Sequence, residues 1–132
     1  MANLPALGAL VEAVKTRLLR RGFLQSIDGG KLFSRSPHSA LNTLLQSAGA
    51  IVMKKALVLL DEALQREGFT PGSEYEFCAN VHDEWQIDVK PECIERVKQI
   101  AVQSIRDAGT YYKFPCPLDG NAEQGSSWAE TH

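Results

Sequence analysis

Two stretches decide the fold of this 132-residue chain: RSPHSALNTLLQSAGA at residues 35–50 and NVHDEWQIDV at residues 80–89. In the first, Ser36 followed by Pro37 is typical of a helix start, since Ser caps the first turn and proline needs no N–H there. We expect this helix to run from Pro37 to Glu67, with Gly68 ending it. At about 1.5 Å per residue it would be ~46 Å long and would cross the whole domain.

The second stretch predicts a hairpin. Aromatic and β-branched residues favour strands over Tyr75–Val81 and Trp85–Val89, with His82, Asp83 and Glu84 between them. Two adjacent carboxylates repel each other, and a rigid strand edge that holds them suits a hard divalent cation. The alternative is an ordinary solvent-exposed turn, because Asp is a common turn residue.

Outside these stretches, the pattern predicts two more helices, a second hairpin and a tail. One helix is expected after a cap at Asn3 and ends at Gly22, and another begins at Pro91 and stops at Gly109. The first of these helices carries an apolar stripe, formed by Leu7, Leu10, Val11, Val14 and Leu18. The second hairpin is expected to pair Phe23–Ile27 with Lys31–Phe33 around the turn Asp28-Gly29-Gly30. From Tyr111 we expect an irregular tail that Trp128 pins.

This order of elements predicts an α+β fold, in which a small antiparallel sheet packs against long helices. The chain is long enough for one hydrophobic core and too short for two. We therefore expect a single domain over residues 1–132.

Composition excludes several classes of protein. Hydrophobic residues make up 44% of the chain and charged residues 23%, as in ordinary soluble proteins. No apolar run reaches the ~20 residues that span a bilayer, and the N-terminus lacks a signal-peptide pattern, so we expect a cytoplasmic protein with no membrane partner. Cys78, Cys93 and Cys116 are too far apart for a CxxC pair and predict small core residues in a reducing compartment.

Charge is divided unevenly along the chain. Residues 1–55 hold eight Lys and Arg against two carboxylates, whereas the remaining residues hold six against fourteen. A basic half beside an acidic half hints at polyanion binding next to metal ligands. Many solvated faces show the same segregation.

Three polar residues of the long helix form a stripe. His38, Asn42 and Gln46 are spaced i, i+4, i+8, so they lie along one line of the helix. Each can donate and accept hydrogen bonds, which suits the acceptors that every base pair shows in the DNA minor groove. A solvated helix face is the alternative.

In this order and about thirty residues apart, the two stretches resemble the C-terminal part of family A DNA polymerases, the phage replicases in particular. The resemblance also takes in the hairpin Asp28-Gly29-Gly30-Lys31 and the ending Ser126–His132, so it covers nearly the entire chain. It implies a palm fragment of a DNA-directed DNA polymerase.

The resemblance also implies roles for single residues. Asp83 matches the aspartate of the family's motif C, which binds the catalytic magnesium ions of a two-metal site. Glu84 neighbours that site as a second candidate ligand with a lesser role, and His82 matches the residue that approaches the primer terminus. The residues that match contacts to the primer–template duplex are Arg35, His38, Asn42 and Gln46.

Parts of the family's machinery have no match here. The second metal-binding aspartate lies in motif A, upstream of anything in this chain, and the fingers helix that binds the dNTP has no match either. We therefore expect a second polypeptide or a missing N-terminal region to supply them, and negligible activity from the isolated chain. A split polymerase, an excised domain and a prophage remnant all fit, and self-association through uncovered surface is a further expectation.

Three other functions stay open. A non-catalytic DNA-binding module would use the basic first 55 residues, and its affinity would fall steeply with salt. A metal-dependent phosphohydrolase could use His82 and Asp83, but such sites need more histidines than His38 and His132 provide. A structural scaffold would need neither divalent metal nor DNA.

Overall fold

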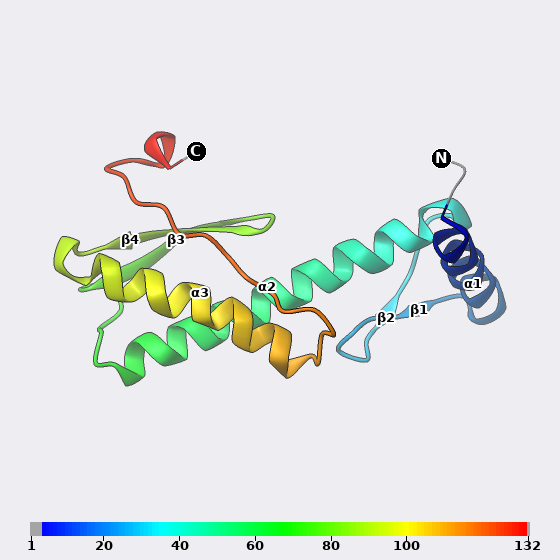
Figure 1. The fold of residues 1–132 in the computed structure, drawn as a ribbon, viewed down its shortest axis with the longest axis horizontal. Helices are drawn as coiled ribbons and strands as arrows, with labels where there is room; N and C mark the ends of the chain where they lie inside the picture. Colours follow the sequence, from blue (N-terminus) through cyan, green and yellow to red (C-terminus); the bar gives the residue numbers. More distant parts are fainter. Residues whose placement is uncertain (1–3, 132) are drawn as a thin grey trace. The chain divides into compact units, whose positions relative to one another are not determined.

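The computed structural model describes residues 4–131 and follows the expected order of helices and strands (Figure 1). The fold is α+β, with two separate two-stranded antiparallel sheets in place of one small sheet. The long elements are α1 (Pro5–Arg21), α2 (Ala40–Arg66), β3 (Tyr75–Val81), β4 (Glu84–Val89) and α3 (Ile94–Tyr111); the short ones are β1 (Leu24–Gln25), β2 (Lys31–Leu32) and the 3₁₀ turns η1 (Pro37–Ser39), η2 (Pro91–Cys93) and η3 (Trp128–Glu130).

The chain forms two compact units, one ending at Ile51 and the other beginning at Val52. The boundary falls inside α2, so this helix contributes its first half to one unit and its second half to the other. The single palm domain over residues 1–132 stays a prediction.

In the first unit, α1 begins at Pro5 and ends where Gly22 adopts a left-handed φ of 75°. The Gly22 N–H donates to the Leu18 carbonyl at 2.7 Å, which satisfies one of the last free acceptors of the helix. Leu4 occupies the N-cap position without a side-chain hydrogen bond, and the expected cap Asn3 lies outside the described residues.

The apolar stripe predicted for α1 is buried only in part. Val14 and Leu18 pack with Leu24 and Ala40 in a small core, whereas Leu7 and Leu10 are nearly half exposed. Periodicity identifies the apolar face of a helix, but burial needs another element to cover it, and within the first unit the covering residues reach only the second half of α1.

The first hairpin is shorter than predicted. Leu24 pairs with Leu32 and Gln25 with Lys31, and the Ser26 N–H closes the loop on the Gly30 carbonyl at 3.0 Å. Asp28 accepts hydrogen bonds in this loop from the Ser26 hydroxyl and the Gly30 N–H. The Asp-Gly-Gly signal therefore predicted the turn correctly, but the ladder extends over two residue pairs only.

The helical segment starts at Pro37, as expected, but its first turn is the 3₁₀ turn η1, and α2 itself begins at Ala40. The Ser36 hydroxyl accepts a hydrogen bond from the Ser39 N–H at 3.3 Å, which caps the turn. The helix ends at Arg66, and Gly68 follows with a left-handed φ of 91°.

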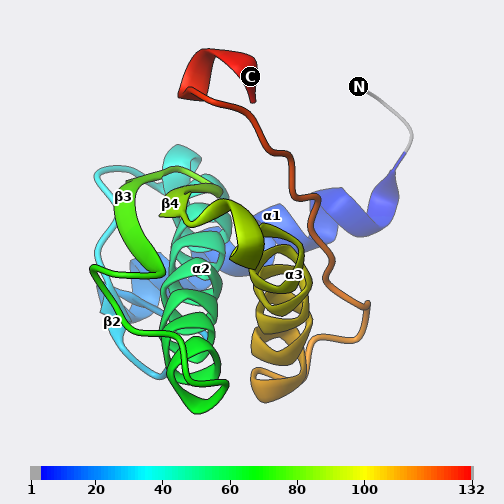
Figure 2. The same ribbon diagram turned by 90° about the vertical axis from the view of Figure 1, so that its left-hand side faces the viewer.

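The second unit has its core where the hairpin β3–β4 lies against α2 and α3 (Figures 1 and 2). Leu60 and Leu64 of α2 are completely buried there. They meet Tyr75 of β3 and Val97 of α3. The Tyr75 hydroxyl donates to Asp61 Oδ1 at 2.6 Å, so a polar contact also ties the start of β3 to α2.

The sequence had suggested that helix α3 stops at Gly109. In the structure, α3 continues to Tyr111. Gly109 is buried inside its last turn, and a Cβ there would lie 2.9 Å from Leu118 Cγ of the tail. The glycine therefore provides room for the tail to pack on the helix. This tertiary contact, and not the end of the helix, explains why a glycine stands at position 109.

One helix among residues 4–131, over Pro37–Arg66, is long and apolar enough to cross a membrane by length and composition alone. The expectation that no segment meets this test is therefore wrong. Core helices of soluble proteins meet it too, and four residues of this helix are completely buried, Ala40, Ala56, Leu60 and Leu64, although only 17% of the apolar window is buried. The absence of a membrane partner stays a prediction.

The three cysteines are free thiols, as expected, but only Cys93 is a core residue. Cys78 and Cys116 are exposed. Cys78 is the extra residue of a β-bulge, because the pairing of β3 with β4 shifts between Phe77 and Ala79.

Replacing Leu64 by alanine should destabilise the second unit by about 2–5 kcal/mol, because it opens a cavity under the hairpin. Val58→Ala is the matched control, since Val58 is 51% exposed on the same helix and its truncation should change stability by less than ~0.5 kcal/mol. Urea unfolding followed by circular dichroism measures both. Equal effects of the two substitutions would contradict the assigned core.

Tyr75 should make the free energy of unfolding decrease at alkaline pH. Burial, and then the hydrogen bond to Asp61, raise the pKa of Tyr75 to about 12. The folded-state pKa lies above the unfolded value of 10, so the stabilisation is complete below pH 10 and is lost as the pH rises towards 12. In urea unfolding, the wild type should lose up to about 2 kcal/mol between these pH values, and Tyr75→Phe should lose less.

Candidate active site at the hairpin turn

The turn between β3 and β4 contains two residues, His82 and Asp83. The sequence had suggested that Glu84 belongs to the turn as well. Glu84 instead pairs with Val81 and is the first residue of β4. The tight turn places Asp83 at the tip of a hairpin whose other end is fixed to α2 through Tyr75.

The backbone of His82 has a φ of 54°, in the left-handed region that residues other than glycine adopt only occasionally. Two-residue hairpin turns require a positive φ, and histidine tolerates it better than branched side chains do. A non-glycine residue held in this region costs free energy, and such positions cluster at functional sites.

Asp83 is exposed, and its carboxylate has no hydrogen bond or ion pair with the other residues that the structure describes. No group of three His, Cys, Asp or Glu within residues 4–131 could hold a metal ion. Magnesium at phosphoryl-transfer sites is bound through one or two carboxylates together with substrate phosphates. Asp83 fits one such ligand position, but the described residues do not complete the site around it.

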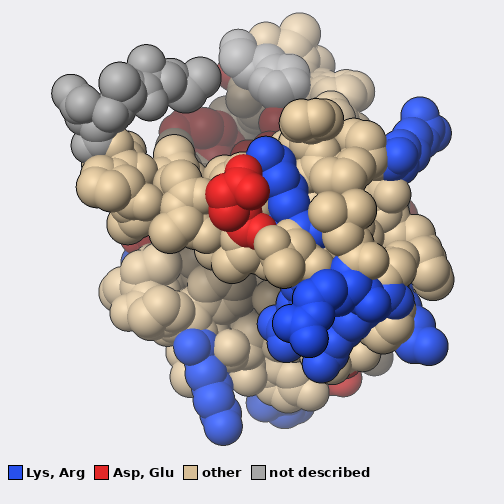
Figure 3. Space-filling model, turned by 90° about the vertical axis from the view of Figure 1, so that its right-hand side faces the viewer, with Lys and Arg blue, Asp and Glu red and all other residues tan. Residues whose placement is uncertain are grey.

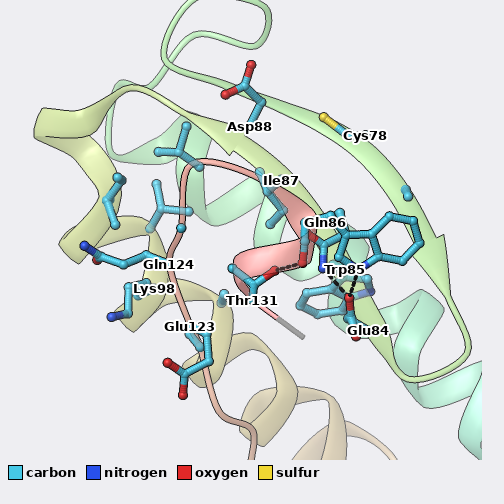
Figure 4. Close-up of a pocket in the computed structure, with 18 of the residues that line it drawn as sticks. Cys78, Glu84, Trp85, Gln86, Ile87, Asp88, Lys98, Glu123, Gln124 and Thr131 are labelled. Carbon is cyan, nitrogen blue, oxygen red and sulfur yellow. Dashed lines mark hydrogen bonds between the residues drawn. The ribbon is translucent and has the colours of Figure 1, made fainter.

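Glu84 has a different environment from Asp83. Its Oε1 accepts a hydrogen bond from the indole Nε1 of Trp128 at 3.0 Å and another from the Gln86 amide (Figure 4). The carboxylate next to the candidate metal ligand therefore fastens the C-terminal tail to β4. Its role as a second metal ligand stays a prediction.

The tail is itself held in a local turn. The Ser126 N–H donates to Glu130 Oε2 at 2.6 Å and the Ser126 hydroxyl donates to Oε1 at 3.0 Å. These bonds, the backbone one first, hold the pKa of the Glu130 carboxyl below its usual value. Sequence analysis predicted that Trp128 pins the tail, but its partner Glu84 was missed because 44 residues separate the two.

A cleft of about 670 Å³ lies between β4, α3 and this tail. Its apolar lining includes Ile87, Val97 and Ile105, while Asp83 and Glu84 are among its polar residues. Figure 4 shows Asp88, which also lines the cleft, pointing away from the side on which Glu84 lies. The hairpin turn and the tail thus border one hollow of the second unit.

The residues predicted to contact DNA belong to the first unit. His38, Asn42 and Gln46 are all exposed, as is Arg35 just before the helix. No hydrogen bond to another described residue occupies these side chains, so they are available to an external partner. Their role in DNA binding stays a prediction.

Comparison with known families decides what kind of chain this is. Residues 8–130 match the family described as DNA polymerase family A. This chain belongs to that family. It is 34% identical to the DNA-directed DNA polymerases of Enterobacteria phage T3 and Escherichia phage T7, and both alignments cover all of this chain and 21% of the relative. The chain thus spans about a fifth of the length of these family A polymerases.

The fold agrees with this assignment. The POL domain of Pol1 from M. smegmatis, in a complex with DNA primer-template and dNTP, superposes with a TM-score of 0.66 at 20% identity. The match covers 86% of this chain and 20% of that one. The arrangement of helices and hairpins described above is therefore a family A polymerase fold.

The contact between Trp128 and Glu84 should hold the tail of this family A chain in place. Trp128→Phe removes the N–H donor, and Glu84→Ala removes the acceptor, so both should speed amide exchange and protease cleavage within residues 121–131. Trp128→Phe should cost about 0.5–1.5 kcal/mol, the range for one hydrogen bond, and Glu84→Ala should cost more, because it also removes the acceptor of the Gln86 amide.

Glu84→Gln is the matched control for that contact, because an amide oxygen still accepts the Trp128 N–H. Its tail should exchange at nearly the wild-type rate, measured by hydrogen–deuterium exchange. If Glu84→Ala and Trp128→Phe exchange as slowly as Glu84→Gln does, the hydrogen bond does not hold the tail.

Proposed function

We propose that this chain is the C-terminal palm portion of a DNA-directed DNA polymerase and supplies Asp83 as one ligand of its catalytic magnesium. The observation that carries the proposal is the exposed, unpaired carboxylate of Asp83 at the tip of a two-residue turn. The two residues of this turn, His82 and Asp83, and the following Glu84 form the segment that resembles motif C of family A polymerases.

The proposed chemistry is nucleotidyl transfer from a dNTP to a primer. Magnesium, when bound, lowers the pKa of the attacking hydroxyl and neutralises charge on the triphosphate. Asp83 contributes a negative oxygen ligand at a fixed place, because the strands on both sides restrict the turn. His82, whose backbone is strained, presents its imidazole from the same turn towards the primer terminus.

Duplex contacts come from the stripe on α2 in this proposal. Asn42 and Gln46 of α2 and His38 of the preceding turn η1 are exposed, and they can donate to the minor-groove acceptors that all correct base pairs share. Arg35 would bind a nearby phosphate. These contacts support primer–template binding regardless of sequence.

The proposal requires a second source of carboxylate. Two metals ~3.5–4 Å apart need more than one aspartate to offset their charge, and the described residues offer no third acidic or imidazole ligand near Asp83. A preceding polymerase region, or a second polypeptide, would bring the other aspartate and the fingers that hold the dNTP. The 132 residues alone should therefore be inactive.

Primer extension tests this. The chain alone should extend a primer undetectably with Mg²⁺ or Mn²⁺, and extension should appear when a polypeptide with the remaining family A polymerase regions is added. Asp83→Asn should then lower the rate by roughly 100-fold or more, since metal stabilisation of the transition state is worth several kcal/mol.

Asp88→Asn is the matched control, because Asp88 is exposed on the same strand but lies away from the turn. It should leave the rate of the mixture unchanged. Metal-dependent extension by the chain alone that disappears in Asp83→Asn would show that this chain or its oligomer already holds the second ligand. Equal rates for the two asparagine variants would remove Asp83 from the metal site.

A further inference from the structure

The outer face of the hairpin β1–β2 is aromatic and basic. Leu24 and Leu32 pair across the hairpin and contact the core of the first unit. Side chains alternate between the two faces of a strand, so Phe23, Lys31 and Phe33 lie on the opposite face. Phe33 is 73% exposed, which is unusual for a residue of its size and polarity.

The two phenylalanine rings lie close together, and one lysine lies over the Phe23 ring. The Phe23 and Phe33 rings lie 6.5 Å apart and are tilted by 56°, and Lys31 Nζ lies 4.9 Å from the centre of the Phe23 ring. Along the chain, the exposed Lys31, Phe33 and Arg35 alternate with the partly buried Leu32 and the two serines that follow. Arg35 follows Phe33 by two positions, in the bend just after β2, so two cations and one exposed ring lie within five residues of the chain.

The first unit has few acidic groups to offset this positive charge. Within residues 4–51 the only carboxylates are Glu12 and Asp28. Glu12 pairs with Lys15 at 2.9 Å, and Asp28 accepts hydrogen bonds inside its own loop, which hold its pKa below the usual value. Three exposed arginines of α1 add to the positive charge and have no carboxylate partner among the residues that the structure describes: Arg17, Arg20 and Arg21. Figure 3 shows Lys and Arg gathered on the side of the molecule that faces the viewer there.

The geometry points to a binding site for single-stranded DNA on this face, with a base stacked on Phe33 and phosphates at Lys31 and Arg35. An exposed ring between cations is the arrangement that single-strand-binding surfaces use, because every base has a π face and every nucleotide a phosphate. Bases of a duplex are already stacked on their neighbours, so a duplex could use the cations but not the ring. Phe33 and Lys31 thus distinguish this site from the polar stripe, which suits a duplex, and Arg35 is the residue that the two sites share.

This inference rests on the proposed function, which makes DNA the ligand. It adds that this face binds the unpaired strand of that DNA. In a polymerase, the single strand present during extension is the template ahead of the primer terminus. A protein partner covering Phe33 is the competing occupant. It would need carboxylates to match Lys31 and Arg35.

Fluorescence anisotropy of the full chain with short labelled oligo(dT), and with a duplex of the same length, tests the site. Phe33→Ala should weaken oligo(dT) binding by roughly 5- to 150-fold, the range for losing one base–aromatic stack. Duplex binding should change less than about two-fold. Phe33→Trp should restore oligo(dT) binding, because the indole also stacks.

Lys31→Gln should reduce the slope of log affinity for oligo(dT) against log salt by about 0.7, the value for one lost phosphate contact on a single strand. Lys90→Gln is its control, since Lys90 is an exposed lysine of the second unit, and it should leave the slope unchanged. Val58→Ala controls for Phe33→Ala, because it also removes an exposed apolar side chain.

Unchanged oligo(dT) affinity in Phe33→Ala, or an equal loss on oligo(dT) and duplex, would overturn the single-strand site. That outcome would leave the proposed function intact, because the primer-extension test compares variants of Asp83 and does not depend on Phe33. Conversely, normal primer extension by a mixture that contains Asp83→Asn would refute the proposed metal ligand. The oligo(dT) measurements would still test whether this face binds single-stranded DNA.

Discussion

A two-stranded hairpin is marginally stable in water, so β3–β4 depends on the apolar surface that α2 offers to it. Leu60 and Leu64 provide that surface and are completely buried. Tyr75 adds a directional contact, because its hydroxyl bonds Asp61 of the same helix. The position of Asp83 follows from this packing, since a two-residue turn has little freedom once both strands are held.

The tail depends on the same hairpin and stabilises it in return. Trp128 donates to Glu84 beside the turn, and Leu118 packs over Gly109 at the end of α3. Adjacent carboxylates therefore have separate tasks: Glu84 is engaged by the tail, whereas Asp83 remains unpaired among the described residues.

Charge is divided between the two units in a way that suits a nucleic-acid enzyme. The first unit carries an exposed polar stripe on α2 and a basic, aromatic face on the hairpin β1–β2. The second unit carries the exposed carboxylate of the turn. A positive surface attracts anions and an exposed carboxylate attracts cations, and the proposed function uses both.

The sequence by itself determined the order of elements, the family, the turn that carries Asp83 and the exposure of the stripe on α2. These features depend on local rules, since caps at Ser36, left-handed glycines such as Gly22 and strand alternation act over a few residues. Only the tertiary structure decided which apolar residues are covered, so Leu7 and Leu10 stay exposed although their pattern matches that of Val14. It also decided that Gly109 gives room to the tail and that Trp128 selects Glu84, because contacts between residues far apart in the chain leave no periodic signal in either segment.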